Sequence, residues 1–593
     1  MSPETKTCQN CKQNFTIEPD DFTFYEKMKV PAPTWCPECR LFRKTMWRSD
    51  IGFFRREDSR TKEIIFAGYP ESAPIKVWEY SYWMSDKWDP LEYGREYDWN
   101  KPFFEQFGAL IREIPWPSLA VEDSVSSPYC NNATSLRNSY LTFGSSYAEE
   151  SFYSFGLARS KNILDSSYMT DCELGYQGVF NRKCYRSFYS NHCKDSSDIF
   201  FCKNCNNLTN CFGCVNLRNK SYCVFNESVG KERYLEFMEK AGLSSYTSVN
   251  EYLRKTFEFW IKFPEKFMSG ANNNNVSGEY INNSKNVSRS FLVDGGENIK
   301  YSSFLYVGGA KDSYDHFRFS NNSELIYDCM ACGSNISRLK FCFHCFPACH
   351  SMDYCASCFS SSDLFGCFGL RKKQYCILNK QYTKEEYEAL VPKIIKHMND
   401  MPYVDQKGLI YKYGEFFPSD YSPLAYNESV TLEYFPLSER EARAKGYRWG
   451  DVTDKQYKAT IQIKDIPDSI DDTKDSILNE VIRCEHDGKC PHPCSTVFRI
   501  VPQELQFYRR FKIPLPHICF NCRHYERLKL WRSHNLFERI CQCAGVKSEN
   551  GAYQNTVAHQ HGAGKCINRF ETSYAPDRKE IIYCEQCYNA EVA

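Results

Sequence analysis

Four cysteines near the N-terminus have the spacing of a tetrahedral metal site. They form two close pairs, Cys8 with Cys11 and Cys36 with Cys39, and 24 residues separate the pairs. Four thiolates that arrive as two close pairs can surround one zinc ion and leave no position for water. Such a site is structural rather than catalytic. Because a module this small has little core, metal binding would supply much of its folding free energy.

A related module returns far along the chain. Cys490 and Cys494 are followed, again after 24 residues, by Cys519 and Cys522. The flanking residues match at a constant offset, with Phe15, Ile17, Pro19, Phe24, Tyr25, Lys29, Pro31, Pro33 and Arg40 repeated as Phe498, Ile500, Pro502, Phe507, Tyr508, Lys512, Pro514, Pro516 and Arg523. The matched gap and flanks argue against chance, and we predict that these four cysteines hold a second zinc ion.

A third site is predicted at the C-terminus. Cys584 and Cys587 form one close pair, and Cys566 precedes a plausible strand. We favour Cys543 as the fourth ligand. The alternatives that remain open for this position are Cys541, His559 and His561. If Cys543 is the fourth ligand, the segment 545–565 is an insertion between Cys543 and Cys566, which would otherwise form a close pair. The expected cofactor is therefore zinc, at about three structural ions per chain, because no cluster-binding run typical of iron–sulfur proteins is present.

The stretch 8–40 resembles the small bacterial treble-clef zinc-ribbon family. The family pattern is CxxC, an aromatic-rich middle and CPxCR, and residues 36–40 (CPECR) fit it fully. The second copy departs from the pattern, with three residues between Cys490 and Cys494 and with Phe520 in place of proline. Residues 570–587 are similar to a second ribbon often found in that family. The whole chain resembles large cysteine-rich zinc-ribbon proteins predicted from uncultivated bacteria, which implies a fold and a metal but no role.

Two blocks in the middle of the chain, 130–229 and 283–381, are related by an internal duplication. Each holds nine cysteines, and their ends align at an offset of 153. The second block also has a period of 13 in two columns, which are Phe291, Phe304, Phe317, Met330, Phe343 and Ala356, and Val293, Tyr306, Phe319, Cys332, Cys345 and Cys358. The columns are two residues apart, so we expect them to share one face of each strand.

Short strands separated by polar turns at fixed spacing are typical of a β-solenoid. The first block has a looser period of roughly 11 to 13 residues. The sequence leaves open whether one repeat forms a coil or whether two repeats form a larger one. Because solenoid ends expose strand edges, helices are expected to cap them. These helices are predicted within 231–263 and over 384–400, where Thr383 and Glu386 have capping-box spacing. Further helices are expected over 100–114 and 473–483.

The predicted fold class is mainly β, with two Cys-rich parallel β-solenoid (β-helix) blocks and capping helices, flanked by small treble-clef or zinc-ribbon modules. The expected domains are a ribbon at 1–48, an aromatic-rich segment at 49–129, solenoid block 1 at 130–229, a helical cap and Asn-rich linker at 230–282, solenoid block 2 at 283–381, a helical cap and mixed linker at 382–483, and ribbons at 484–540 and 541–593.

The 18 solenoid cysteines have two interpretations. Burial as small apolar groups is the simpler one, since Cys332, Cys345 and Cys358 fall in one column. Alternatively, stacked cysteines bind metal or store redox equivalents. The histidines that could join such a site are His192, His316, His344 and His350.

Charge and hydropathy restrict the partners. The chain has 74 basic and 74 acidic residues, so binding to nucleic acid would require a local patch. Basic residues with aromatic neighbours occur in 40–56 and 509–539, where Arg43, Lys44, Arg527 and Lys529 could contact RNA or a protein complex. A solvated helix face is the competing interpretation. The first residues show no basic segment followed by an apolar run, so we expect no signal peptide, and no apolar stretch approaches the roughly 20 residues of a membrane helix. We therefore expect a cytoplasmic protein with reduced cysteines and no membrane partner.

Catalytic motifs are missing from the sequence. It contains no phosphate-binding loop, no HExxH and no nucleophile motif. The favoured function is therefore a non-catalytic zinc-binding scaffold. The alternatives are a metal- or redox-handling protein and a polysaccharide-acting enzyme. The carboxylates that could serve such an enzyme on the solenoid are Asp165, Asp171, Asp195 and Asp198.

Overall fold

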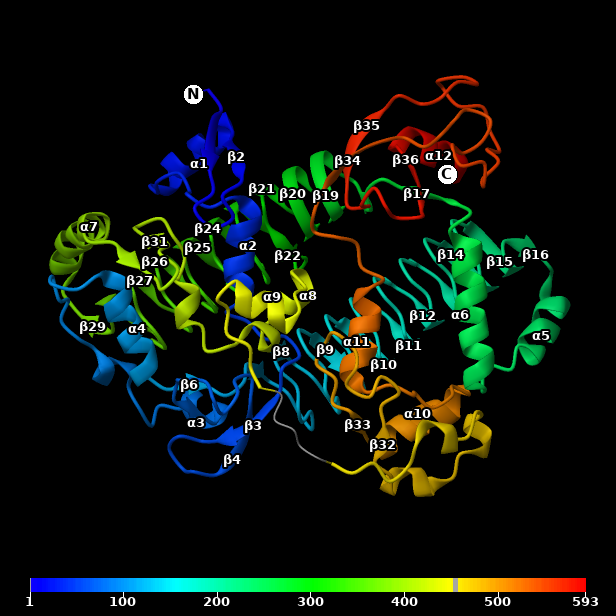
Figure 1. Cartoon of the computed structure of the whole chain (residues 1–593), viewed down its shortest axis with the longest axis horizontal. Helices are drawn as coiled ribbons and strands as arrows, with labels where there is room; N and C mark the ends of the chain where they lie inside the picture. The colour runs from blue at the N-terminus through cyan, green and yellow to red at the C-terminus, as the bar shows by residue number, and fades with distance from the viewer. Residues whose placement is uncertain (1, 452–456, 593) are drawn as a thin grey trace. The chain divides into compact units, whose positions relative to one another are not determined.

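The chain forms two compact units whose segments alternate along the sequence. The structure is a computed structural model and describes residues 2–451 and 457–592. Unit 1 comprises Met1–Leu119, Met268–Gly450 and His534–Leu536, and unit 2 comprises Ala120–Phe267, Asp451–Ser533 and Phe537–Ala593. Each unit therefore contains one solenoid block together with Cys-rich modules that lie far from it in sequence (Figure 1).

The solenoid of unit 2 is a sheet of strands in sequence order. Its strands are β7 (Val121–Glu122), β8 (Ala133–Thr134), β9 (Ser146–Glu149), β10 (Ala158–Leu164), β11 (Glu173–Tyr176), β12 (Tyr185–Phe188), β13 (Ser197–Phe200), β14 (Asn206–Phe212), β15 (Arg218–Val224) and β16 (Glu227–Ser228). All neighbours pair in parallel except β15 with β16. Lys161 pairs with Glu173, twelve residues further on, so one repeat forms one coil.

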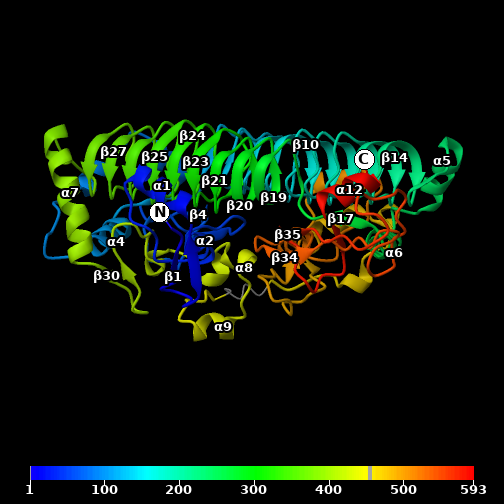
Figure 2. The same ribbon diagram turned by 90° about the horizontal axis from the view of Figure 1, so that it is seen from above.

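The solenoid of unit 1 is built in the same way, and Figure 2 shows the strands stacked as successive rungs. Its strands are β18 (Gly270–Ala271), β19 (Asn274–Asn282), β20 (Lys285–Asp294), β21 (Glu297–Lys300), β22 (Ser303–Leu305), β23 (Ala310–Tyr314), β24 (Ser323–Tyr327), β25 (Ile336–Lys340), β26 (His350–Asp353), β27 (Ser362–Phe365), β28 (Gln374–Ile377) and β29 (Lys380–Gln381). Ser323 pairs with Ile336, thirteen residues on, and Ser362 with Gln374, twelve residues on. The predicted mainly-β solenoid fold is confirmed.

A backbone bend at every third residue gives these coils their small size. Between Asp123 and Phe225 every third residue has a positive φ, in the left-handed region. This conformation is costly for residues other than glycine. Hydrogen bonds between coils offset that cost. The bent residue donates its N–H to the preceding coil, as Asp165 does to Phe152 O at 3.1 Å and Tyr168 does to Phe155 O at 2.9 Å.

The residue after each bend points into the core, and this rule places the cysteines. The buried cluster of unit 2 follows it from Cys130 and Ala133 through to Cys223. Cysteines share this interior with alanine and with larger aliphatic side chains such as Ile163 and Leu208. Serine and cysteine also donate to backbone carbonyls, as Ser160 Oγ does to Ala158 O at 2.9 Å and Cys184 Sγ does to Arg182 O at 3.4 Å. Cysteine is therefore used here as a small core residue with a weak donor.

The expectation that both columns of the 13-residue repeat share one face is wrong. Ala331 has a φ of 52°, so the chain turns between Met330 and Cys332. Cys332 belongs to the interior cluster. Met330 lies on the outer wall, where it bridges to Phe343, whose ring is 6.4 Å from that of Trp47. Val293, Cys332, Cys345 and Cys358 of one column therefore lie in the core, whereas Met330 and Phe343 of the other lie on the wall where other parts of unit 1 pack.

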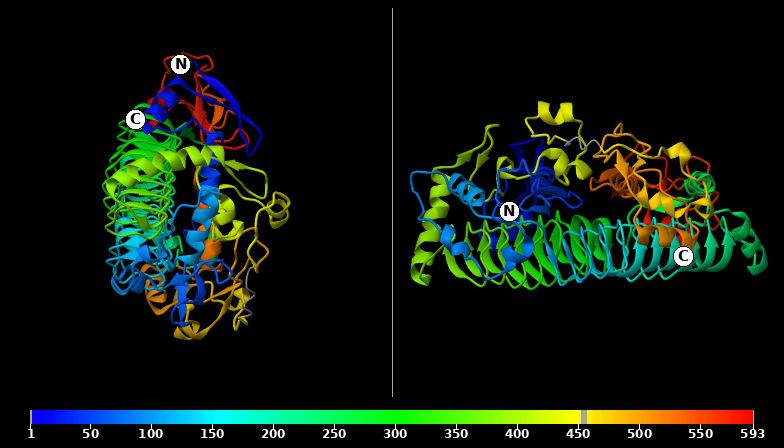
Figure 3. Two further views of the ribbon diagram at one scale, coloured as in Figure 1. Left: turned by 90° about the vertical axis from the view of Figure 1, so that its left-hand side faces the viewer. Right: turned by 90° about the horizontal axis from the view of Figure 1, so that it is seen from below.

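Helices follow the last coil of each block, as predicted. They are α5 (Lys231–Lys240) and α6 (Tyr246–Trp260) in unit 2, and α7 (Lys384–Asp400) in unit 1 (Figure 3). The rings of Tyr222 and Tyr234 are 5.9 Å apart, and so are those of Tyr375 and Tyr387. Both contacts join the last coil to the capping helix at corresponding positions. Thr383 and Glu386 form the predicted capping box. Thr383 is the N-cap residue, so α7 begins at Lys384.

The other elements of unit 1 surround its solenoid. They are β1 (Glu4–Thr7), β2 (Asn14–Ile17), α1 (Pro19–Met28), α2 (Pro37–Thr45), β3 (Phe54–Glu57), β4 (Ile64–Ala67), β5 (Val77–Trp78), α3 (Tyr80–Met84), η1 (Pro90–Tyr93), α4 (Phe103–Glu113), β6 (Trp116–Pro117), β30 (Tyr403–Val404), β31 (Ile410–Tyr411), η2 (Ser419–Tyr421), η3 (Tyr426–Glu428), α8 (Thr431–Tyr434) and α9 (Glu439–Ala444). Helix α4 lies within the predicted 100–114.

Unit 2 has a corresponding set. Its further elements are β17 (Pro264–Lys266), η4 (Ile463–Asp465), η5 (Ile470–Asp472), η6 (Asp475–Asn479), β32 (Ile482–Arg483), β33 (Val497–Phe498), α10 (Pro502–Phe511), α11 (Phe520–Leu528), β34 (Phe537–Ile540), β35 (Arg569–Thr572), β36 (Ile581–Tyr583) and α12 (Glu585–Val592). The helix predicted over 473–483 is wrong, because η6 is a 3₁₀ turn and β32 pairs with β33. Strand pairing overrides the local helical propensity there. No helix in the described ranges is both long and apolar enough to cross a membrane.

Candidate metal centres

Each cysteine module consists of a β-hairpin followed by a helix, and the same backbone positions carry its cysteines. In the N-terminal module, Cys8 directly follows β1, and α2 begins directly after Cys36 with Cys39 in its first turn. We call the regions built around α11 and α12 the middle module (482–533) and the C-terminal module (537–592). Cys519 and Cys584 occupy the position of Cys36 in them, immediately before the helix.

All four predicted cysteines of the N-terminal module come together. The Sγ atoms of Cys8, Cys11, Cys36 and Cys39 all lie within 4.8 Å of one another. Cys11 Sγ is 3.7 Å from Cys36 Sγ, and zinc–sulfur bonds of about 2.3 Å in a tetrahedron separate the sulfurs by about 3.8 Å. The backbone N–H of Cys36 donates to Cys8 Sγ at 3.2 Å, and Asn10 Nδ2 donates to Cys39 Sγ at 3.2 Å. These donors favour thiolates, so the group could hold a metal ion.

The middle module assembles three of the four predicted cysteines and replaces the other. Cys494, Cys519 and Cys522 are grouped with Cys484, whereas Cys490 lies in a neighbouring group. Cys484 follows strand β32 just as Cys8 follows β1. The N–H of Cys519 donates to Cys484 Sγ at 3.3 Å, which repeats the Cys36–Cys8 bond. The signal in the sequence is the β-branched pair Val481 and Ile482 shortly before Cys484, in the segment 473–483 for which the sequence predicts a helix.

The C-terminal module also selects the cysteine that follows a strand. Its four-thiol group is Cys541, Cys566, Cys584 and Cys587, so Cys541 takes the position for which Cys543 was favoured. Cys541 follows β34, and the N–H of Cys584 donates to its Sγ at 3.2 Å. Hydrogen bonding from the Cys541 thiol lowers the pKa of Cys584 to about 4, against the opposing effect of burial. The low pKa favours the thiolate that a metal ion requires.

Two further groups of potential ligands adjoin these thiols. One consists of His486, Cys490, His492 and Cys522, and the other of Cys543, His559, His561 and Cys587. Apart from Cys522 and Cys587, their members lie in segments inserted between the first two cysteines of a module. From the sequence, His559 and His561 are alternatives for a single ligand position. The clue in the sequence was the combination of a cysteine with two closely spaced histidines inside each insertion.

The solenoid cysteines are arranged differently. Among the described residues, the groups of cysteine, histidine and carboxylate side chains close enough for a metal ion include none of the solenoid cysteines. All 18 are buried. Burial raises the pKa of Cys130 to about 11 and that of Cys349 to about 12, so these thiols stay protonated at neutral pH. Burial likewise lowers the pKa of His316 to about 4 and that of His344 to about 3. The burial of all 18 cysteines and their absence from the ligand groups of the described residues favour the simpler interpretation of the solenoid cysteines as core residues.

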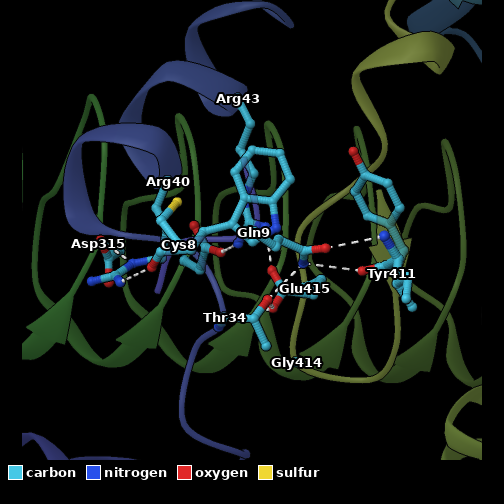
Figure 4. Close-up of polar contacts among 12 residues, drawn as sticks. Cys8, Gln9, Thr34, Arg40, Arg43, Asp315, Tyr411, Gly414 and Glu415 are labelled. Atoms are coloured by element: carbon cyan, nitrogen blue, oxygen red, sulfur yellow. Dashed lines mark hydrogen bonds and ion pairs between the residues drawn. The ribbon is translucent and has the colours of Figure 1, made fainter. Parts of the chain in front are cut away.

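The basic residues after the N-terminal cysteines point into the protein. Figure 4 shows Arg40 directed at Asp315 and Arg43 at Glu415. Arg40 Nε is 2.9 Å from Asp315 Oδ1, and both side chains are 1% exposed. Arg43 also pairs with Asp328, which accepts from Lys44 as well. Burial opposes ionisation of Asp328, but Arg43 and Lys44 hold its pKa below the usual value.

Buried ion pairs of the same kind join the middle module to the solenoid of unit 2. Arg523 and Arg527 stand 483 residues after Arg40 and Lys44. Arg523 Nη1 is 3.1 Å from Asp165 Oδ2 and 3.3 Å from Glu504 Oε1, and Arg527 Nη1 is 3.3 Å from Asp165 Oδ1. Asp165, Asp315 and Asp328 each occupy the bend directly after a solenoid strand. The two modules are therefore attached to their solenoids by buried cations at equivalent bends.

The four solenoid aspartates considered for catalysis each have their own cation. Asp165 is buried against the arginines of α11. The other three form separate ion pairs, Arg159 with Asp171 at 2.6 Å, Arg186 with Asp198 at 3.0 Å and Lys194 with Asp195 at 3.5 Å. They serve attachment and surface pairing, which does not favour a role as a general acid and base.

Comparison of the sequence with protein-family models and with curated proteins found no family model that matches it and no relative among those proteins. The candidate centres are therefore interpreted from their geometry and from the resemblance described above.

Proposed function

We propose that this protein is a non-catalytic scaffold in which zinc ribbons of the treble-clef type are attached to the β-solenoid of their own unit. Zinc is the proposed ion because it accepts four thiolates in a closed tetrahedral site and undergoes no redox chemistry there. The resemblance of residues 8–40 to zinc ribbons supports the same choice. In this proposal the three four-thiol groups are structural sites.

The observation that carries the proposal is the repeated attachment of a cysteine module to a solenoid bend. Cys39 and Arg40 are neighbours on α2, as are Cys522 and Arg523 on α11. A metal ion that fixes the first turn of such a helix also fixes the arginine that reaches the buried aspartate. Binding of zinc and docking of the module are therefore coupled steps of folding.

Chelation with hydrogen exchange tests this coupling on the full chain. Zinc removal should strip protection from the amides of α2 and α11, while the amides of β13 and β26 in the solenoid interiors stay protected. If both helices keep their protection after complete metal removal, the modules do not depend on zinc and the proposal fails.

For the partner, we propose another protein rather than RNA. Arg43, Lys44 and Arg527, named above as candidate phosphate contacts, are each 1% exposed. Lys529 is exposed but pairs with Glu526 at 2.7 Å. Fluorescence anisotropy with a single-stranded RNA should therefore show no salt-sensitive binding. If RNA binds, and if binding weakens steeply with salt and is lost in Lys529→Glu, the RNA alternative would replace this one.

We further propose that the protein works in the reducing cytoplasm. All 32 cysteines are free in the structure, and the proposed sites need thiolates rather than disulfides. A surface for a protein partner is offered by the exposed strand faces of the solenoid, where charges repeat in register, as Arg159 with Asp171 and Arg186 with Asp198 do.

A further inference from the structure

We propose that Cys522 and Cys587 each bridge two zinc ions, so that the middle and C-terminal modules hold binuclear centres and the chain binds five ions in all, one for each ligand group. This inference rests on the proposed function, because it requires that the modules bind zinc. It adds two sites, one formed by His486, Cys490, His492 and Cys522 and the other by Cys543, His559, His561 and Cys587.

Cys522 stands midway between two sets of ligands. Its Sγ is 3.9 Å from Cys484 Sγ, in the four-thiol group, and 3.8 Å from Cys490 Sγ, in the other group. Both distances match the edge of about 3.8 Å expected between two sulfurs on one tetrahedral zinc. One thiolate has lone pairs enough to bind an ion on each side.

The two histidines of the ligand group in the middle module, His486 and His492, each have a ring nitrogen without a hydrogen-bond partner in the described part of the chain. Among the described residues, His486 Nδ1 and His492 Nε2 are buried atoms without a hydrogen-bond partner. A buried polar atom in this state is costly, and native proteins satisfy nearly all of them. Coordination to an ion shared with Cys490 and Cys522 would satisfy both nitrogens.

The C-terminal module presents its histidines with the outer partners that metal-bound histidines usually have. His559 Nδ1 is 3.4 Å from Cys543 Sγ, and His561 Nε2 is 3.4 Å from Cys587 Sγ. One nitrogen and one sulfur on a tetrahedral zinc are separated by about 3.5 Å. The opposite ring nitrogens are 2.7 Å from Glu591 Oε1 for His559 and 2.9 Å from Gly564 O for His561. These contacts place the protons on the outer nitrogens and leave the inner lone pairs for metal.

Charge balance favours the second ion. Four thiolates around one divalent ion carry a net charge of −2, whereas five thiolates and two neutral histidines around two ions carry −1. Cys541 and Cys543 are both fully buried, so an extra negative charge there would be costly. The second ion therefore neutralises part of the charge that the first centre creates.

The N-terminal module provides an internal comparison with a single ion. Only two residues separate Cys8 from Cys11, whereas insertions of 9 and 24 residues separate Cys484 from Cys494 and Cys541 from Cys566. Cys39 is the counterpart of Cys522 and Cys587, but among the described residues it belongs to a single ligand group, and its Sγ accepts a hydrogen bond from Asn10 Nδ2 at 3.2 Å. The extra ligands thus occur only where an insertion supplies them.

Native mass spectrometry and elemental analysis of the full chain separate the possible results. Five zinc ions per chain, as many as the ligand groups, support both the proposed function and the binuclear centres. Three ions would leave the structural ribbons intact and overturn this inference. A chain without zinc would overturn both.

Variants then assign the additional ions. The double substitution of His559→Ala and His561→Ala should remove one ion and leave the four-thiol group of Cys541, Cys566, Cys584 and Cys587 loaded. The matched control is His397→Ala, which lies outside every ligand group and should keep all the ions. Unchanged zinc content in the double variant would contradict the assignment.

Bridging by Cys522 and Cys587 is tested by ¹¹³Cd NMR of the wild-type chain after its zinc has been replaced by cadmium. This test does not depend on whether a variant folds. Two cadmium nuclei that share a thiolate show spin coupling through the sulfur. Of the five resonances expected from the five groups, four should appear as two coupled pairs and one, from the N-terminal module, should be uncoupled. Five uncoupled resonances would mean that the ions are present but that Cys522 and Cys587 do not bridge them.

Discussion

Replacement of Asp165 by asparagine should loosen the middle module from the solenoid of unit 2. The side chain is fully buried and faces Arg523 and Arg527 at 3.1 and 3.3 Å. Arg523 keeps a second carboxylate, Glu504, at 3.3 Å. Arg527 has no comparable second carboxylate within the described ion pairs, and burial already lowers its pKa to about 10.

The cost follows from leaving a buried cation without its counter-charge. Removing one member of a buried ion pair typically costs about 3 to 5 kcal/mol. We expect the lower end, about 3 kcal/mol, because Glu504 still compensates Arg523. At about 1.4 kcal/mol per tenfold change in an equilibrium constant, the opening of α11 should become about 100-fold more favourable.

Hydrogen exchange of zinc-loaded full chain measures this opening, because unfolding of a chain with two units is not a single transition. The amides of Phe520–Leu528 should exchange about 100-fold faster in Asp165→Asn, while those of α2 in unit 1 keep the wild-type rate. The matched control is Asp171→Asn. Asp171 lies six residues further on, pairs with Arg159 at the surface and should contribute about 0 to 1 kcal/mol.

A second substitution checks the reasoning. Adding Arg527→Met to Asp165→Asn removes the uncompensated charge and should recover part of the lost protection. If Asp165→Asn exchanges like Asp171→Asn, or if the double variant is worse than the single one, the buried pair does not attach the module as described.

Three further predictions concern the outer shell of a centre, the solenoid core and pH. Glu591→Gln should weaken the ion bound by His559 by about 10- to 100-fold in a zinc-competition titration, and an unchanged affinity would show that Glu591 does not orient the histidine. Cys349, with a pKa raised by burial to about 12, should resist alkylation at pH 8 in native protein and react after denaturation, as peptide mass spectrometry can verify, whereas rapid native alkylation would contradict its place in the core. His316 has a pKa lowered by burial to about 4, so the stability it contributes is complete above about pH 6.5 and is lost as the pH falls toward 4. At pH 5 the loss should be about 2 kcal/mol, measured by hydrogen exchange of unit 1, and His316→Gln should remove this part of the pH dependence.

The repeats in the sequence were sufficient to predict the solenoid and its capping helices. The 13-residue period arises because equivalent residues stack in successive coils, so it predicts the coils. The 153-residue offset arises from the duplication, so it predicts a second solenoid with its own capping helix. The repeats did not reveal which column faces the core and which faces the outer wall. A strand alternates faces every two residues, but this backbone bends at every third residue, and Ala331 separates Met330 from Cys332. Nothing in a period of 13 reveals that bend.

The candidate metal ligands were predictable where the spacing was undisturbed. Cys8, Cys11, Cys36 and Cys39 assemble as expected because two residues separate the first pair. In the other modules an insertion separates that pair, and the nearest cysteines in sequence, Cys490 and Cys543, are not those that follow the strand. Hairpin position decides the ligand, and this is a property of backbone pairing rather than of spacing.

The attachment of the modules could not be derived from charge patterns. Arg40 and Arg523 look like members of basic patches in the sequence, yet each reaches a buried aspartate more than 250 residues away. Solenoid bends that expose Asp315 and Asp165 to these arginines exist only after both partners have folded.

Zinc K-edge X-ray absorption of the purified full chain tests the central claim most directly, since it reports the atoms that surround the metal. We expect four-coordinate zinc with zinc–sulfur distances of about 2.3 Å and, with all five ligand groups loaded, about three sulfurs and one nitrogen per ion on average. A first shell dominated by oxygen, or cysteines of the three modules joined in disulfides with no bound zinc, would contradict it.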